Sequence, residues 1–233
     1  TYAAKTAIER SGVNPEELDY ILLAHNFGDV RHGFTQCDIL PSIAARVKHN
    51  LQIKNNNCVA FDVVFGCPGW LQALIQADAF IKAGLAKKCL VIGAETLSRV
   101  VDKHDRDSMI YSDGAGACIV ENTDEKDSGI LRHASQTFAK EEAYYLHYGG
   151  SYDKNKDQNV RYIKMYGRKI YEFAITNVPK AMKSAFEDVR KQIAELNSFV
   201  QERISGMKIV QLFSREKIEY DNFVEINEKH KNE

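Results

Sequence analysis

The chain of 233 residues is 44% hydrophobic, and its 31 basic and 32 acidic residues give a formal net charge of −1. This balance argues against a nucleic-acid-binding protein or one held on an anionic membrane, while the apolar content suffices for a packed core. Five irregularly spaced cysteines fit neither a zinc site nor a redox CxxC pair. No apolar run approaches the about 20 residues of a membrane span. We expect a globular, cytoplasmic protein with no metal and no nucleic-acid partner.

The first part of the chain alternates predicted helices and strands. Turn residues and apolar runs place them, in chain order, as a helix over 2–10, a strand over 20–24, a helix over 41–50, a strand over 58–64, a helix over 70–83 and a strand over 88–93. The near-continuous apolar run of 58–64 predicts a strand buried on both faces. Strands that alternate with crossover helices indicate an α/β fold, a mostly parallel sheet covered by helices.

Beyond the predicted sheet the pattern is weaker. The segment "DGAGACIV" (113–120) offers a glycine-rich turn and a strand, with 129–138 as its expected partner strand. Residues 139–164 are polar and rich in tyrosine, and too many for an ordinary connection, so we expect a functional loop or flap there. A helix resumes near Met165.

The last part of the chain, from Val189 onward, is predicted to be all helical. Apolar residues recur at spacings of three and four, at Val189, Ile193, Leu196, Val200, Ile204 and Met207. Ser205 and Gly206 are expected to interrupt this helix, with a short segment over 207–213 and a third piece over 215–229. Periodicity by itself favours an ordinary amphipathic helical hairpin.

The segment "VVFGCPGWLQAL" (63–74) makes Cys67 a candidate nucleophile. The cysteine lies where a strand becomes a helix, and a helix start stabilises a thiolate and offers backbone N–H groups to an oxyanion. Gly66 and Gly69 permit a tight turn and the close approach of a substrate, and Pro68 suits the first helical turn. A cysteine among apolar residues is also commonly a small core residue, and the local sequence leaves both interpretations of Cys67 open.

Four segments together resemble β-ketoacyl-ACP synthase III, a condensing enzyme of the thiolase superfamily. They read "FDVVFGCPGWLQAL", "KAGLAKKCLVIGAETLS", "DKHDRDSMIYSDGAGACIV" and "MYGRKIYEFAITNVPKAMKSA". The resemblance covers about residues 1–187, enters part-way through the first half of the family and stops early, so a partial thiolase-like domain, truncated at both ends, is expected. It implies an acyltransferase of fatty-acid or related acyl-chain biosynthesis, acting as a homodimer.

The resemblance also implies the chemistry. Cys67 would take an acyl group from acyl-CoA as a thioester, and decarboxylation of malonyl-ACP would supply the carbanion that attacks it. The partners are thus acyl-CoA and acyl carrier protein, and no cofactor is needed. Arg106 falls where the family places an arginine against the CoA adenine, and Met165 and Gly167 match a stretch that lines the pantetheine tunnel.

Two residues of the family's decarboxylation machinery have no match. The family needs a histidine in an "HQAN"-like motif and a later asparagine, but residues 200–207 read "VQERISGM" and no histidine occurs between His147 and His230. The histidines at 25, 32, 49, 104 and 133 match non-catalytic parts of the family, so structural or solvated roles are expected for them. We expect this chain by itself to form no carbon–carbon bond.

Residues 195–230 resemble a different family, the cytoplasmic helical extension of an ABC exporter transmembrane domain. In that family residues 205–214 would form the short helix that docks on a nucleotide-binding domain. The segment has no membrane span and no GxxxxGK[ST] loop. The predicted organisation is a condensing-enzyme domain over 1–187 and a helical tail over 188–233, joined near 186–190 by a fusion or rearrangement. Alternatives are an exporter fragment or a non-catalytic thiolase-like scaffold.

Overall fold

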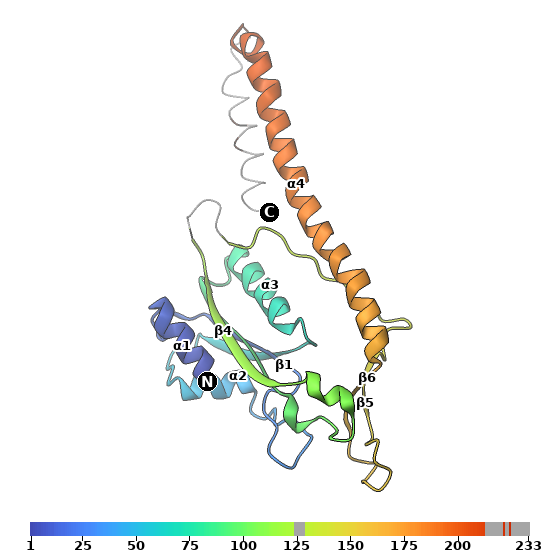
Figure 1. Ribbon diagram of the computed structural model, residues 1–233. Coiled ribbons are helices and arrows are strands. Elements are labelled where there is room, and N and C mark those ends of the chain that lie inside the picture. The colour runs from blue at the N-terminus through green and yellow to red at the C-terminus, as the bar shows by residue number, and fades with distance from the viewer. Residues whose placement is uncertain (124–128, 213–220, 222–223, 225–233) are drawn as a thin grey trace. The chain divides into compact units, whose positions relative to one another are not determined.

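The computed structural model describes residues 1–123, 129–212, 221 and 224 (Figure 1). The chain divides into two compact units, one formed by residues 1–125 and 139–170 and the other by residues 126–138 and 171–233. The helices and strands are α1 (Tyr2–Ser11), β1 (Tyr20–His25), α2 (Ile43–Asn50), β2 (Val59–Val64), α3 (Gly69–Lys82), β3 (Lys88–Thr96), β4 (Asp113–Glu121), β5 (Leu146–Gly149), β6 (Tyr162–Met165) and α4 (Gly167–Leu212), with short 3-10 turns η1 (Pro15–Glu17), η2 (Leu97–Arg99) and η3 (Arg106–Ile110).

The first unit is built on a four-stranded sheet with the order β2-β1-β3-β4. Strand β1 pairs in parallel with both neighbours, so that Tyr20 lies opposite Val59 of β2 and opposite Cys89 of β3. Strand β4 runs antiparallel to β3. The predicted mostly parallel sheet is confirmed. The carboxyl ends of its three parallel strands meet at one edge, which is where ligands bind in open α/β sheets.

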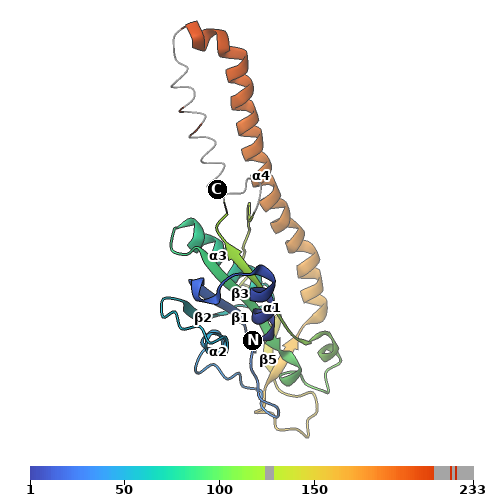
Figure 2. The same cartoon turned by 90° about the vertical axis from the view of Figure 1, so that its left-hand side faces the viewer.

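Helices cover both faces of this sheet, as the two views of Figures 1 and 2 show. On one face, α1 and α2 pack on alternate strand residues, in a core of Ala4, Ile8, Ile21, Leu23, Ile43, Ala44, Val47, Leu90 and Ile92. On the other face, α3 packs on the intervening ones, in a core of Leu22, Ala24, Val63, Ala73, Ala77, Cys89 and Val91. Successive strand side chains point to opposite faces, so the near-continuous apolar runs of β1 and β3 supply both cores.

The predicted helix ends are confirmed at two glycines. Gly12 follows α1 with a φ of 70°, and its N–H donates to the carbonyl of Ile8 at 3.0 Å. Gly84 follows α3 with a φ of 73°. Glycine adopts this left-handed conformation without the steric cost that a Cβ would add.

Two expectations about strands are wrong. Strand β2 is an edge strand, where Val59 and Val64 are 47% and 74% exposed, rather than a strand buried on both faces. An apolar run shows that a segment can be buried but not which position it takes in a sheet. Residues 129–138 form no strand, because β3 itself continues to Thr96 and pairs with β4 along its whole length.

The polar segment 139–164 is anchored by a buried ionic cluster. It folds into the antiparallel hairpin of β5 and β6. The Lys164 ammonium on β6, 4% exposed, lies 2.5 Å from Asp102 Oδ2, 3.2 Å from Asp105 Oδ2 and 3.7 Å from the centre of the Tyr152 ring. Asp102 also accepts hydrogen bonds from the Ser151 hydroxyl at 3.0 Å and from the Tyr152 N–H at 2.8 Å. The hairpin is therefore tied to the segment after β3 by charge as well as by packing.

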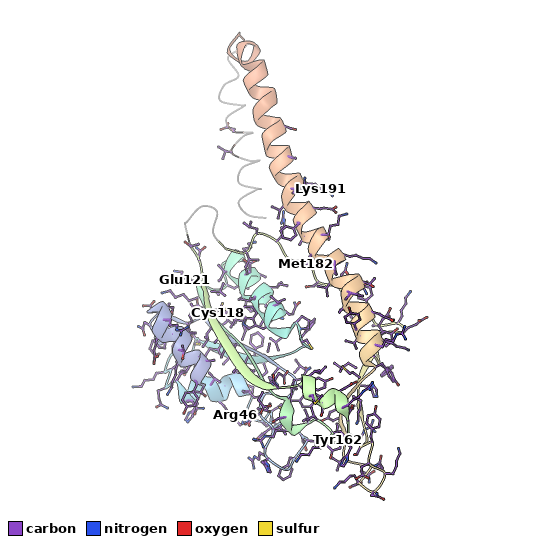
Figure 3. The ribbon with its side chains drawn as sticks, viewed as in Figure 1. Arg46, Cys118, Glu121, Tyr162, Met182 and Lys191 are labelled. Atoms are coloured by element: carbon purple, nitrogen blue, oxygen red, sulfur yellow. The ribbon has the colours of Figure 1, made fainter. Side chains whose placement is uncertain are left out.

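Helix α4 is continuous from Gly167 to Leu212 and contains Pro179. The predicted interruption at Ser205–Gly206 is wrong, since a glycine inside a helix costs only about 1 kcal/mol. Residues 205–212 of the expected short helix therefore belong to α4 and form no separate element. Most of the expected third piece, over 215–229, lies outside the described residues. Within the second unit, Met182 projects from α4 as an exposed side chain (Figure 3). No helix among the described residues is long and apolar enough to cross a membrane.

Candidate functional site

A cavity of about 760 Å³ opens in the first unit at the carboxyl edge of the sheet. The ends of β1 and β3, the segment after β2, the beginning of β4, and the β5–β6 hairpin all contribute to its wall. The cavity is lined by, among others, His25, Asn26, Phe27, Gly66, Cys67, Gly69, Trp70, Gly93, Glu95, Tyr111, His147, Tyr148 and Ile163. Elements far apart in the sequence therefore meet in one hollow.

Cys67 lies in this wall, between the end of β2 and the start of α3, and is exposed. Pro68 is the N-cap residue of α3, and no side chain caps the first turn. The Gly69 N–H donates to the carbonyl of Gly66 at 2.8 Å, which closes the turn around Cys67. The predicted placement of this cysteine beside a helix start is what the structure shows, and the alternative of a buried core residue does not apply to it.

Two glycines bring the start of α3 close to the sheet. A Cβ on Gly69 would lie 3.2 Å from the Cβ of Ala24 on β1, and a Cβ on Gly93 of β3 would lie 3.2 Å from the Cβ of Trp70. Either added carbon would be closer to its neighbour than most packed Cβ atoms are, so the helix start or the strand would have to shift by a few tenths of an ångström. The position of Cys67 thus depends on the absence of side chains at these two residues.

The segment after β1 is held at the cavity by residues of β3. The carboxylate of Glu95 accepts hydrogen bonds from the N–H groups of Asn26 and Phe27, both at 2.7 Å. The Thr96 hydroxyl donates to the carbonyl of Phe27 at 2.6 Å. These hydrogen bonds join residues that lie far apart in the sequence, so no local sequence pattern predicts them.

His25 lines the cavity but is engaged on both sides of its ring. It is 2% exposed, its Nδ1 accepts from the Gly28 N–H at 3.3 Å, and its Nε2 lies 3.1 Å from Asp62 Oδ2. The Asp62 carboxylate also accepts from the N–H groups of Ile43 and Ala44, at 2.8 Å and 2.7 Å, at the start of α2. This arrangement agrees with the structural role expected for His25.

Besides Nε2 of His25, which faces the Asp62 carboxylate, two polar atoms in the cavity wall are buried without a hydrogen-bond partner in the described part of the chain: the hydroxyl oxygen of Tyr111 and Nδ1 of His147. Burial raises the pKa of Tyr111 to about 12, and the Cys67 thiol contributes next, followed by Asp105 and Asp107. Tyr111 and Cys67 line the same cavity. Neither Tyr111 nor His147 was predicted from the sequence to have a role, because neither stands in a motif or at a spacing that indicates one.

The other four cysteines lie in different surroundings. Cys58 and Cys89 are buried, and Cys37 and Cys118 are partly buried, the latter on β4 (Figure 3). Burial raises the pKa of all four thiols, that of Cys89 to about 12. Because the thiolate is the nucleophilic form, these four are poor nucleophiles at neutral pH.

The three residues expected to contact CoA are not among those that line the cavity. Arg106 is the first residue of η3, and its side chain is 95% exposed. Met165 ends β6 and Gly167 begins α4. A Cβ on Gly167 would lie 3.3 Å from Asp107 Oδ2 and 3.6 Å from the methyl carbon of Met165. The structure therefore brings η3 and the β6–α4 junction together, but none of the three expected residues is among those that line the cavity.

Two family models match different parts of the chain. Residues 61–138 match the family of 3-oxoacyl-[acyl-carrier-protein] synthase III. Residues 170–233 match the transmembrane region of ABC transporters. The first match includes Cys67 and most of the cavity wall, and the second begins close to the boundary between the two compact units.

Individual proteins support the first match over a longer stretch. A β-ketoacyl-ACP synthase III of Erythrobacter litoralis is 35% identical over 200 residues, which cover 84% of this chain and 58% of that protein. One from Novosphingobium aromaticivorans is 36% identical over 206 residues, with the same coverage. The crystal structure of the Aquifex aeolicus enzyme superposes with a TM-score of 0.63 at 35% identity, over 79% of this chain and 53% of that one. The predicted thiolase-like α/β fold is confirmed, and the chain spans between half and two thirds of the length of these relatives.

Proposed function

We propose that residues 1–187 are a condensing-enzyme domain of the β-ketoacyl-ACP synthase III type, in which Cys67 accepts an acyl group from acyl-CoA. The observation that carries the proposal is the exposed Cys67, which lies just before the start of α3 in the wall of the cavity. The similarity to the relatives described above supports the same assignment. Its place is fatty-acid or related acyl-chain biosynthesis.

The proposed reaction is an exchange of one thioester for another. The Cys67 sulfur attacks the thioester carbonyl, the carbonyl oxygen becomes an oxyanion, and the bond to the CoA sulfur breaks to release CoA as its thiol. The N–H groups of Trp70 and Leu71 in the first turn of α3, which no side chain caps, are available to the oxyanion, whereas the Gly69 N–H already donates to the carbonyl of Gly66. The exchange neither oxidises nor reduces the substrate, so it requires no cofactor.

The binding partners are proposed from the same resemblance. Arg106 would contact the CoA adenine, and Met165 and Gly167 would border the path of the pantetheine arm toward Cys67. The side chain of Arg106 is free to reach a ligand because it is 95% exposed, and its Nε lies 3.8 Å from Asp107 Oδ1. We also propose that acyl carrier protein delivers the second substrate. The proposed working form of the protein is a homodimer.

The first test is acylation of the protein. Incubation with acetyl-CoA should add one acetyl group to the chain, and Cys67→Ala should abolish the addition because no other exposed thiol is present. Intact-mass spectrometry followed by peptide mapping measures both the number and the position of the acetyl groups. The matched control is Cys118→Ala, which should acylate as the unaltered chain does. Acetylation that persists in Cys67→Ala would contradict the proposal.

Condensation is expected to be absent. The chain has no histidine between His147 and His230 to stabilise the enolate that forms when malonyl-ACP loses carbon dioxide. With acetyl-CoA and malonyl-ACP supplied together, we expect acyl-Cys67 but no β-ketoacyl product by mass spectrometry. If β-ketoacyl product forms and disappears in Cys67→Ala, other residues of the chain take over the roles of the family's unmatched histidine and asparagine.

Residues 188–233 suggest a second candidate function. The match of 170–233 to the ABC transporter transmembrane region favours a segment of exporter origin that contacts a nucleotide-binding domain. Such a fragment, or a thiolase-like scaffold without chemistry, has no reason to hold an acyl group on one cysteine. The acetylation experiment therefore separates both alternatives from the first proposal.

A further inference from the structure

The cavity wall contains polar groups that an alkyl chain cannot hydrogen-bond. The hydroxyl oxygen of Tyr111 and Nδ1 of His147 are both buried, both belong to residues that line the cavity, and neither has a hydrogen-bond partner in the described part of the chain. Buried polar atoms are nearly always paired, so two such exceptions in one hollow require an explanation.

A neighbouring tyrosine shows the contrast. Tyr148 lines the same cavity, stacks on Phe27 with ring centres 5.6 Å apart, and donates its hydroxyl hydrogen to the carbonyl of Thr35 at 2.8 Å. Its polar group is satisfied within the protein. Tyr111 has no equivalent acceptor in the described part of the chain, although it lines the same cavity as Cys67.

An acyl chain on Cys67 would fill the space beside Tyr111 and displace any water there. A plain alkyl chain would then leave the phenol buried against carbon, which costs the full desolvation of an unpaired polar group. A chain with a hydroxyl near the thioester avoids this cost, because a hydroxyl both donates and accepts and can therefore serve the phenol and the imidazole nitrogen in either tautomer. Sites built to hydrogen-bond a substrate hydroxyl reject the analogue without it far more strongly than apolar pockets reject an extra methylene.

We propose that Tyr111, with His147, selects acyl thioesters that carry a hydroxyl group on the carbons next to the thioester. Tyr111 is the specificity-determining residue, and its phenol hydrogen-bonds the hydroxyl of the chain held on Cys67. This inference rests on the proposed acyl transfer to Cys67 and names the substrate class for that site.

The test compares two CoA thioesters of equal chain length, 3-hydroxybutyryl-CoA and butyryl-CoA, by the rate at which each acylates Cys67. The unaltered chain should prefer the hydroxylated thioester by about tenfold to a hundredfold, the range expected for one unpaired buried polar group. Tyr111→Phe removes only the hydroxyl and should bring the ratio of the two rates close to unity. Tyr148→Phe, which removes a hydroxyl that the protein already satisfies, should keep the preference.

Equal rates in the unaltered chain, or a preference that survives in Tyr111→Phe, would overturn the inference and leave acyl transfer to Cys67 intact. If neither thioester acylates the chain, the proposed function fails, and calorimetric titration of Cys67→Ala with the two thioesters decides the inference separately. Tighter binding of 3-hydroxybutyryl-CoA that Tyr111→Phe removes would support it. Equal affinity, or no binding of either thioester, would overturn it.

Discussion

Lys164→Met is expected to destabilise the first unit by about 3–5 kcal/mol, the usual cost of removing one partner from a buried ion pair. Asp102 and Asp105 face this ammonium at 2.5 Å and 3.2 Å, and Asp102 is only 2% exposed, so the variant buries carboxylates without a cation. Urea unfolding followed by the fluorescence of Trp70, the single tryptophan, measures the change in the first unit.

The control is Lys183→Met, in which the lost partner is exposed. Lys183 lies 3.5 Å from Glu187 on α4, and both side chains are largely in solvent. An exposed pair one helical turn apart contributes about 0.3–0.5 kcal/mol, so this variant should unfold almost as the unaltered chain does. Similar urea midpoints for Lys164→Met and the unaltered chain would show that the cluster is not a stabilising anchor.

The pH dependence of this cluster follows from two pKa shifts. Burial acts to raise the pKa of Asp102, but hydrogen bonds from Lys164, Tyr152, His104 and Ser151 outweigh it and hold that pKa well below its usual range. Burial acts to lower the pKa of Lys164, yet its bonds to the two carboxylates raise it overall. The contribution of Asp102 is present above the ordinary carboxyl pKa of about 4 and is lost as the pH falls through the folded value. That of Lys164 is present below about pH 10 and is lost as the pH rises through its folded value, so the anchor should hold over the whole neutral range.

Asp62→Ala is expected to destabilise the first unit by about 3 kcal/mol, combining lost bonds to a charged acceptor with the loss of a helix cap. The carboxylate accepts from the N–H groups of Ile43 and Ala44 and faces Nε2 of the buried His25. Removal leaves the start of α2 and the imidazole without their shared partner. The same urea experiment measures the effect.

Ser42→Ala is the matched comparison for Asp62→Ala, because Ser42 caps the same helix. Its hydroxyl accepts from the Ala45 N–H at 3.2 Å and, unlike the Asp62 carboxylate, contacts no second helix N–H or imidazole in the described part of the chain. Loss of an ordinary N-cap costs about 1 kcal/mol. If the two variants lose the same stability, the additional contacts of Asp62 with the α2 start and His25 contribute nothing.

The elements whose signal is local were predicted correctly from the sequence. The apolar run of β1 is central and buried, and Gly12 and Gly84 end their helices in the left-handed conformation. The position of a strand within a sheet is a long-range property, which is why the edge location of β2 was missed. Helix α4 passes through Gly206 because a single weak residue does not end a long helix whose other residues favour it.

The candidate site divides in the same way. Cys67 could be identified because the glycines and proline beside it form a local pattern, and its exposed position agrees with that interpretation. Tyr111 and His147 reach the same cavity from other parts of the chain, so only the fold shows that they lie in its wall. A tyrosine whose hydroxyl is satisfied and one whose hydroxyl is not are identical in a sequence.

Strand β2 ends just before Cys67, and on its outer side no other strand of the described chain pairs with it. Its main-chain N–H and C=O groups there form a ready template on which a foreign strand can align, with exposed Val59 and Val64 at its two ends. At high protein concentration we therefore expect edge-to-edge aggregation to begin at β2. Because Cys67 follows the end of β2 by three residues, a strand bound at this edge would lie beside the segment that leads to the candidate nucleophile.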